Sequence, residues 1–148
     1  MLFRSGKSLV ARVQAEAKTA VLSHLEGLNH TYLHAAADLD MARDIVVNAK
    51  MRRVSVCGST ETLLVDAEAA GRLLPPVAQA LIAAGCELRG DARAQALVPA
   101  MSAAVEADWT TEYLAPILAV RIVDGLDAAV DHIRTHGSGH TEIGRAHV

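Results

Sequence analysis

The stretch ILAVRIVD, residues 117–124, decides the fold class of this 148-residue chain. Only Arg121 and the closing Asp124 interrupt its run of apolar residues. A strand covered on both faces has such a nearly continuous apolar sequence, whereas a strand with one face in water alternates between apolar and polar residues. The stretch therefore predicts a strand in the interior of a parallel sheet.

Helix-like and strand-like segments alternate on both sides of this strand. Directly after it, Leu126, Ala129 and Ile133 share one face of a helix that Gly137 ends. The other helices are expected at residues 8–18, 39–50 and 75–85, and the other strands at 19–27, 29–36, 62–66 and 86–90. This alternation predicts an α/β protein with a mostly parallel sheet.

Two of these helices carry more detailed expectations. In the helix of residues 39–50, Asp38 is the predicted N-cap, and Lys50 is expected to face water. In the helix of residues 75–85, the two adjacent prolines are expected to form the first turn, with Gly85 at the end.

The composition indicates one domain with an aliphatic core, because 51% of the residues are hydrophobic but only 3% are aromatic. The net charge is −3, from 14 basic and 17 acidic residues, and no basic run stands out, so we expect no nucleic-acid partner. The apolar stretches are too short to cross a bilayer, and the N-terminus does not resemble a signal peptide. We therefore expect a cytoplasmic protein without a membrane partner.

A metal site is not expected. The two cysteines, Cys57 and Cys86, do not form a CxxC pair. His132, His136 and His140 have a spacing that would stack them along a helix, but the glycines around residue 138 should end that helix before His140.

Cys57, within VSVCGSTETLLVD (residues 54–66), is the candidate nucleophile. The preceding Lys50, Arg52 and Arg53 would favour a thiolate, and the small residues of CGST would let backbone N–H groups approach an oxyanion. No histidine base stands at a protease-like spacing. From the residues alone, a nucleophile and an inert packing residue both remain open.

Seven segments, taken together, resemble the gamma-glutamyl phosphate reductase family of the aldehyde dehydrogenase superfamily, which is also called glutamate-5-semialdehyde dehydrogenase. In chain order they read GKSLVARVQAEAK, HLEG with the following NH, AADLDMARDIVVNAKMRR, VCGSTETLLVD, LRGD, DWTTEYLAPILAVRIVDGLDAAVDHI and HGSGHTE. The resemblance runs from about Gly6 to Glu142, and VDGLDAAVDHIRTHGSGHTE looks like the family's signature.

The resemblance implies a covalent reduction. Cys57 would attack the acyl carbon of gamma-glutamyl phosphate, phosphate would leave, and NADPH would reduce the thioester to glutamate 5-semialdehyde for proline biosynthesis. Two alternatives stay open: another oxidoreductase of the superfamily that uses the same cysteine, and a non-catalytic α/β module in which Cys57 is inert.

The resemblance also implies further site residues. Glu112, which begins EYLAPI, is expected to hold the nicotinamide ribose, and His140 is expected to help hold the substrate or its phosphate. Glu26 in HLEG sits where aldehyde-oxidising relatives keep a base, but a reductase has no need of it. A small-molecule substrate and, at full length, a homo-oligomer are expected.

The resemblance implies an aldehyde dehydrogenase-like catalytic domain, truncated at both ends. Residues 1–26 would be the end of the nucleotide-binding domain, and residues 27–142 an incomplete catalytic domain. Residues 143–148 are expected to be non-biological, because EIGRAHV looks like a translated sequencing adapter. The fragment alone is expected to be inactive.

Overall fold

A five-stranded sheet organises the chain, and the computed structural model describes residues 7–23 and 25–140 of it. The strands lie in the order β1-β2-β5-β3-β4, and each described pair of neighbours is parallel. The elements in chain order are α1 (Lys7–Glu16), β1 (Asn29–Leu33), α2 (Leu39–Met51), β2 (Thr60–Asp66), α3 (Ala70–Ala83), β3 (Glu87–Gly90), α4 (Ala92–Leu97), β4 (Ser102–Ala103), the 3-10 helix η1 (Glu106–Thr110), β5 (Ile117–Val123) and α5 (Gly125–His136). The predicted α/β class with a parallel sheet is therefore confirmed.

The strand β5 occupies the interior position that its apolar run predicted. It lies between β2 and β3, and Leu118, Ala119 and Val120 have no exposed surface. Its neighbour β2 is buried along its whole length. The long connections through helices that parallel pairing requires explain why strands distant in the sequence lie side by side.

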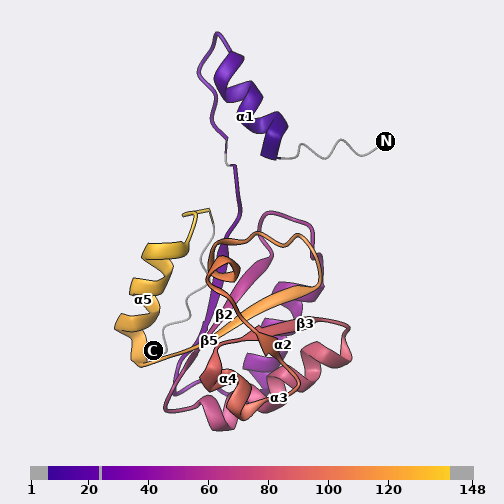
Figure 1. Cartoon of the computed structure of the whole chain (residues 1–148), viewed down its shortest axis with the longest axis vertical. Helices are drawn as coiled ribbons and strands as arrows, with labels where there is room; N and C mark the ends of the chain where they lie inside the picture. The colour runs from indigo at the N-terminus through magenta and orange to yellow at the C-terminus, as the bar shows by residue number, and fades with distance from the viewer. Residues whose placement is uncertain (1–6, 24, 141–148) are drawn as a thin grey trace.

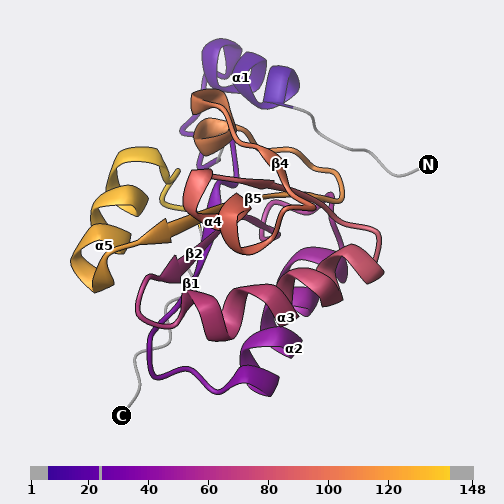
Figure 2. The ribbon, with the colours of Figure 1, turned by 60° about the horizontal axis from the view of Figure 1, so that its bottom comes forward.

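Helices cover both faces of the sheet (Figures 1 and 2), with α2, α3 and α4 on one face and α5 on the other. Successive side chains of β2 point to opposite faces of the sheet. Leu63 and Val65 join the large aliphatic core under α2 and α3, whereas Leu64 packs with Ala129 of α5. This alternation follows from the two-residue period of a strand.

The first helix stands apart from the sheet (Figure 1). Its apolar residues Leu9 and Val13 are 48% and 44% exposed, so the helix buries little surface against the described chain. The boundary that we expect at residue 26 stays a prediction.

Two expectations were wrong: a strand at residues 19–27, and the start of the helix that contains Pro75 and Pro76. No strand forms in the described residues of the range expected to be one, 19–23 and 25–27, and Leu22 there is fully exposed. Helix α3 begins at Ala70, so Pro75 and Pro76 lie inside the helix rather than in its first turn. The fully buried Leu73, Leu74, Val77, Ala78 and Leu81 explain the extension, because burial outweighs the lost hydrogen bonds.

The helix α2 has the predicted N-cap but not the predicted polar face. The Asp38 carboxylate accepts a hydrogen bond from the backbone N–H of Met41 at 2.9 Å, which confirms the cap. Lys50, however, is 0% exposed instead of facing water. Its charge is matched by Glu61 on β2, 2.6 Å away, and this long-range partner is what the helical periodicity could not show.

Candidate active site

Cys57 is an exposed free thiol on the loop that joins α2 to β2. Turns within residues 53–59 and weak hydrogen bonds from the Ser59 hydroxyl to the carbonyls of Ala49 and Lys50, at 3.5 and 3.4 Å, close this loop against the end of α2. Cys57 is therefore not buried in this chain, and the choice between a nucleophile and an inert residue stays a prediction. Cys86, by contrast, is 4% exposed, and burial raises the pKa of its thiol to about 11.

The buried side chain of Asn29 fixes the backbone of this loop. Its amide nitrogen Nδ2 donates to the carbonyl oxygen of Cys57 at 2.6 Å and to that of Ser59 at 3.0 Å. A third acceptor, the carbonyl of Gly27, lies 3.2 Å away. One side chain at the start of β1 thus orients the segment that carries the thiol.

Gly27 brings a second segment directly against Cys57. A Cβ atom added at position 27 would lie 2.0 Å from the carbonyl oxygen of Cys57, so only a glycine allows this approach. Gly27 therefore lies against the thiol-bearing loop, and the preceding Glu26 is half-buried. Sequence reasoning missed both Gly27 and Asn29, and the available signal was a glycine followed closely by a polar residue at the start of a buried strand.

Glu112 reaches the same place from the loop between η1 and β5. Its Oε1 accepts the backbone N–H of Gly27 at 3.0 Å, although the two residues are 85 positions apart. No hydrogen bond to Oε2 is present within residues 7–23 and 25–140. Gly27 therefore touches Cys57 on one side and Glu112 on the other, which joins the two sequence-predicted residues.

A buried ion pair lies beneath these loops. Lys50 and Glu61 are 0% and 1% exposed at their side chains, and Nζ lies 2.6 Å from Oε2. The other oxygen of Glu61 accepts the backbone N–H of Leu114 at 3.4 Å. Burial raises the pKa of Glu61, while the charge and hydrogen bond of Lys50 oppose this rise.

The segment after α5 returns to the same end of the sheet. The Ser138 hydroxyl accepts the backbone N–H of Leu28 at 2.9 Å, next to Gly27. The helix ends at His136 with Gly137 as the C-cap, as expected, and His140 is half-buried at the edge of the described chain. His140 therefore lies two residues from a contact with the candidate site.

His30, His132 and His136 form a separate cluster on the α5 face. The ring centroids of His132 and His136 are 4.5 Å apart, and those of His30 and His132 are 5.3 Å apart. Nδ1 of His132 lies 3.1 Å from the Arg121 guanidinium, and burial, reinforced by nearby cationic groups, lowers the pKa of His132 to about 3. Among the described residues no group of three His, Cys, Asp or Glu side chains is arranged to hold a metal ion.

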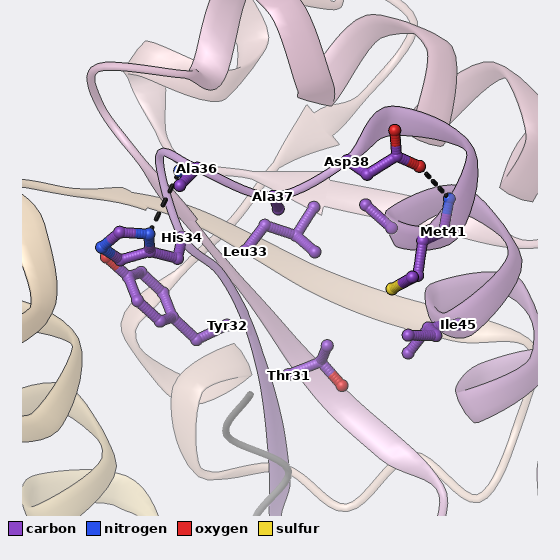
Figure 3. A pocket seen from close by; sticks show the side chains of 10 residues that line it. Thr31, Tyr32, Leu33, His34, Ala36, Ala37, Asp38, Met41 and Ile45 are labelled. Carbon is purple, nitrogen blue, oxygen red and sulfur yellow. Dashed lines mark hydrogen bonds between the residues drawn. The ribbon is translucent and has the colours of Figure 1, made fainter. Parts of the chain in front are cut away.

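Two cavities lie outside the candidate site. One of about 410 Å³ is a largely apolar hollow between β1 and the start of α2, where His34 and Asp38 cap local turns (Figure 3). The other, of about 480 Å³, lies between β5 and α5, next to Arg121 and His132. Neither Cys57 nor Glu112 lines either cavity.

No helix in the described part of the chain has the length and apolar character needed to span a membrane.

The chain is similar over almost its whole length to proteins named gamma-glutamyl phosphate reductase. It is 68% identical to that of Caulobacter sp. (strain K31) over 139 residues, which is 94% of this chain and 33% of the relative. It is 58% identical to that of Methylobacterium radiotolerans, over 94% of this chain and 32% of the relative. This chain thus spans about a third of the length of these relatives. No family model matches it.

Solved structures give the same result. The crystal structure of gamma-glutamyl phosphate reductase from Thermotoga maritima superposes with a TM-score of 0.90 at 36% identity, covering 94% of this chain and 34% of that chain. An acetylating aldehyde dehydrogenase from Geobacillus thermoglucosidasius has a TM-score of 0.64 at 19% identity, over 93% of this chain and 39% of the other, and shares the fold alone. The resemblance and the aldehyde dehydrogenase-like fold expected from the sequence are confirmed.

Proposed function

We propose that this chain supplies the thiol-bearing part of a gamma-glutamyl phosphate reductase. The reaction converts gamma-glutamyl phosphate to glutamate 5-semialdehyde and phosphate, with NADPH as the reductant, in proline biosynthesis. The observation that carries the proposal is the exposed thiol of Cys57 on a loop held by Asn29 and Gly27, in a chain 68% identical to a relative with that name.

Cys57 acts as the nucleophile. Its sulfur forms a bond to the acyl carbon of the substrate while the bond from that carbon to the phosphate oxygen breaks, so phosphate leaves and a thioester remains. Sulfur suits this step because a thiolate attacks well and also leaves well, which divides one difficult reduction into two easier steps. The hydrogen bonds from Asn29 hold the backbone of the loop that carries this thiol.

Glu112 is the proposed ligand of the nicotinamide ribose. Its Oε1 is held by Gly27, and Oε2 accepts no hydrogen bond within the described residues, so it can accept one from a ribose hydroxyl. When bound, the cofactor supplies the hydride that reduces the acyl group. Gly27 therefore contacts both Glu112 and the backbone of Cys57.

His140 is the proposed contact for the substrate or its phosphate. The support is its position two residues after Ser138, whose hydroxyl binds the backbone beside Gly27. A neutral or charged imidazole can donate a hydrogen bond to a phosphate oxygen.

The remaining proposals concern the whole protein. Residues 1–26 would end a nucleotide-binding domain, residues 27–142 would form part of the catalytic domain, and residues 143–148 would be non-biological. The full-length protein would be a cytoplasmic homo-oligomer. The chain alone would be inactive, because it carries about a third of its relatives' length.

The test uses a chimaera in which this chain replaces the matching 139-residue stretch of the Caulobacter sp. relative. Turnover is followed in reverse, as NADPH formed from glutamate 5-semialdehyde, phosphate and NADP⁺. We expect Cys57→Ser to reduce turnover to background and Cys86→Ala, the matched control at the buried cysteine, to preserve it. Undiminished turnover by the Cys57→Ser chimaera would refute the proposal. The same chimaera is also assayed with free aldehydes in the absence of phosphate, and with acyl-CoA substrates. Turnover of these substrates would instead indicate another oxidoreductase of the superfamily.

A further inference from the structure

We infer that the buried ion pair of Lys50 and Glu61 is a positioning device that holds the Cys57 loop and the Glu112 loop together. The inference rests on the proposed function of these two loops. Lys50 and Glu61 are positioning residues, because neither reaches a substrate from its buried place beneath the loops.

The pair closes the Cys57 loop at its base. Lys50 lies in the last turn of α2 and Glu61 is the second residue of β2, so the loop leaves the fold beside one partner and re-enters it beside the other. The distance of 2.6 Å from Nζ to Oε2 joins these two ends. A buried ion pair is a poor source of stability compared with packed apolar residues, which points to a role other than stability.

Glu61 also holds the Glu112 loop. Its Oε1 accepts the backbone N–H of Leu114 at 3.4 Å, across 53 residues of sequence. Leu114 has a φ of +51°, in the left-handed region that residues other than glycine rarely adopt. The Leu114 side chain is 45% exposed, so its burial does not impose this backbone conformation. The conformation instead directs the Leu114 amide to the Glu61 carboxylate, which accepts its hydrogen bond.

Lys50 contacts the same loop through Tyr113. Its Nζ lies 5.9 Å from the centroid of the Tyr113 ring, and the Tyr113 hydroxyl donates to Asp108 at 2.7 Å. The loop that carries Glu112 is therefore anchored at the two residues that follow it. Both residues of the pair therefore connect the two ends of the Cys57 loop to the loop that carries Glu112.

Two double variants of the chimaera separate positioning from folding. Lys50→Met with Glu61→Gln removes both charges but keeps a side-chain oxygen for the Leu114 amide. Lys50→Met with Glu61→Leu removes that oxygen as well. Each neutralises the whole pair, so neither leaves a lone buried charge that would unfold the protein.

The readouts are the dissociation constant of NADPH, measured by its fluorescence, and the rate of Cys57 alkylation by iodoacetamide. We expect both variants to alter the rate of Cys57 alkylation, because both lose the ion pair that joins the two ends of the Cys57 loop. We expect the Leu variant to bind NADPH about tenfold more weakly than the Gln variant, from the loss of the hydrogen bond to Leu114. The KM for NADP⁺ should rise in the same proportion with a smaller change in kcat. Equal dissociation constants in two folded variants would overturn the inference.

A measurement without substitutions decides the matter if the Leu variant does not fold. Amide hydrogen exchange should be slower at Leu114 than at Tyr113, whose N–H donates no hydrogen bond within the described residues. Equally fast exchange at both amides would refute the contact. NADPH binding and amide exchange do not require turnover, so failure of the proposed reaction in the Cys57→Ser test stays distinguishable from failure of this inference.

Discussion

A Cβ atom at Gly27 would lie 2.0 Å from the carbonyl oxygen of Cys57 and 2.8 Å from its carbonyl carbon. Both neighbours are backbone atoms, so no side-chain rotation relieves the overlap. The Gly27 backbone also donates to Glu112 at 3.0 Å, so any shift of this residue moves the thiol-bearing loop relative to Glu112.

The first prediction is that Gly27→Ala disrupts the site. The added methyl group should displace the Cys57 loop, lower the free energy of unfolding by about 1–3 kcal/mol through overpacking, and reduce turnover of the chimaera by ~10²-fold through misplacement of the thiol. Turnover and thermal unfolding are measured together. The matched control is Gly58→Ala in the same loop, where an added Cβ meets nothing within 4 Å. Equal turnover in the two variants would contradict the close approach.

The second prediction concerns the polar anchor of the loop. Asn29→Asp keeps the size of the side chain but removes the amide that donates to the carbonyls of Cys57 and Ser59. A carboxylate facing these carbonyls should repel them, so we expect a loss of about 1–3 kcal/mol of stability and altered iodoacetamide reactivity at Cys57. The exposed Asn48→Asp is the control, and a wild-type alkylation rate in Asn29→Asp would count against the anchoring role.

Features that depend on residues close together in the sequence could be predicted, whereas contacts between distant residues could not. The apolar run of β5 and the Asp38 cap are local signals, and both predictions were confirmed. Lys50 was wrongly expected in water because its partner Glu61 lies on another element, and only the tertiary fold brings them within 2.6 Å.

The candidate site shows the same division. Cys57 and Glu112 were identified from the resemblance to a family, and their catalytic and cofactor-binding roles stay predictions. The residue that joins them, Gly27, is 30 positions before Cys57 and 85 before Glu112, and no short motif encodes such a contact. Asn29 was missed for a similar reason, because the carbonyls of Cys57 and Ser59 become its neighbours only when β1 pairs with β2.

The third prediction tests Glu112 as the ribose ligand. Glu112→Gln keeps an oxygen for the Gly27 amide but removes the charge, so we expect the KM for NADP⁺ to rise about tenfold from the weakened hydrogen bond to the ribose. The alkylation rate of Cys57 should change little, since the Gly27 contact persists. Glu106→Gln, at an exposed carboxylate of η1, is the control. An unchanged KM in Glu112→Gln would remove Glu112 from the cofactor site.

The fourth prediction concerns the pH dependence of stability. His132 is 6% exposed and its Nδ1 faces the Arg121 guanidinium, so the folded protein keeps this imidazole neutral down to a pKa of about 3, against 6.5 for the ordinary side chain. The unfolded chain takes up this proton as soon as the pH falls below about 6.5. The stability that neutral His132 provides is therefore fully present above that pH and is lost progressively as the pH falls toward 3.

Replacing this residue should remove that loss. In the chimaera, His132→Leu is expected to lower by about one the number of protons taken up on unfolding between pH 6 and pH 4, which denaturant titrations at several pH values measure directly. The control is His34→Gln, because His34 lies on the turn after β1, where its Nδ1 accepts the Ala36 amide. If the free energy of unfolding depended on pH as steeply in His132→Leu as in the unsubstituted chimaera, the prediction would be wrong. His132 would then be protonated in the folded state in spite of its burial against Arg121.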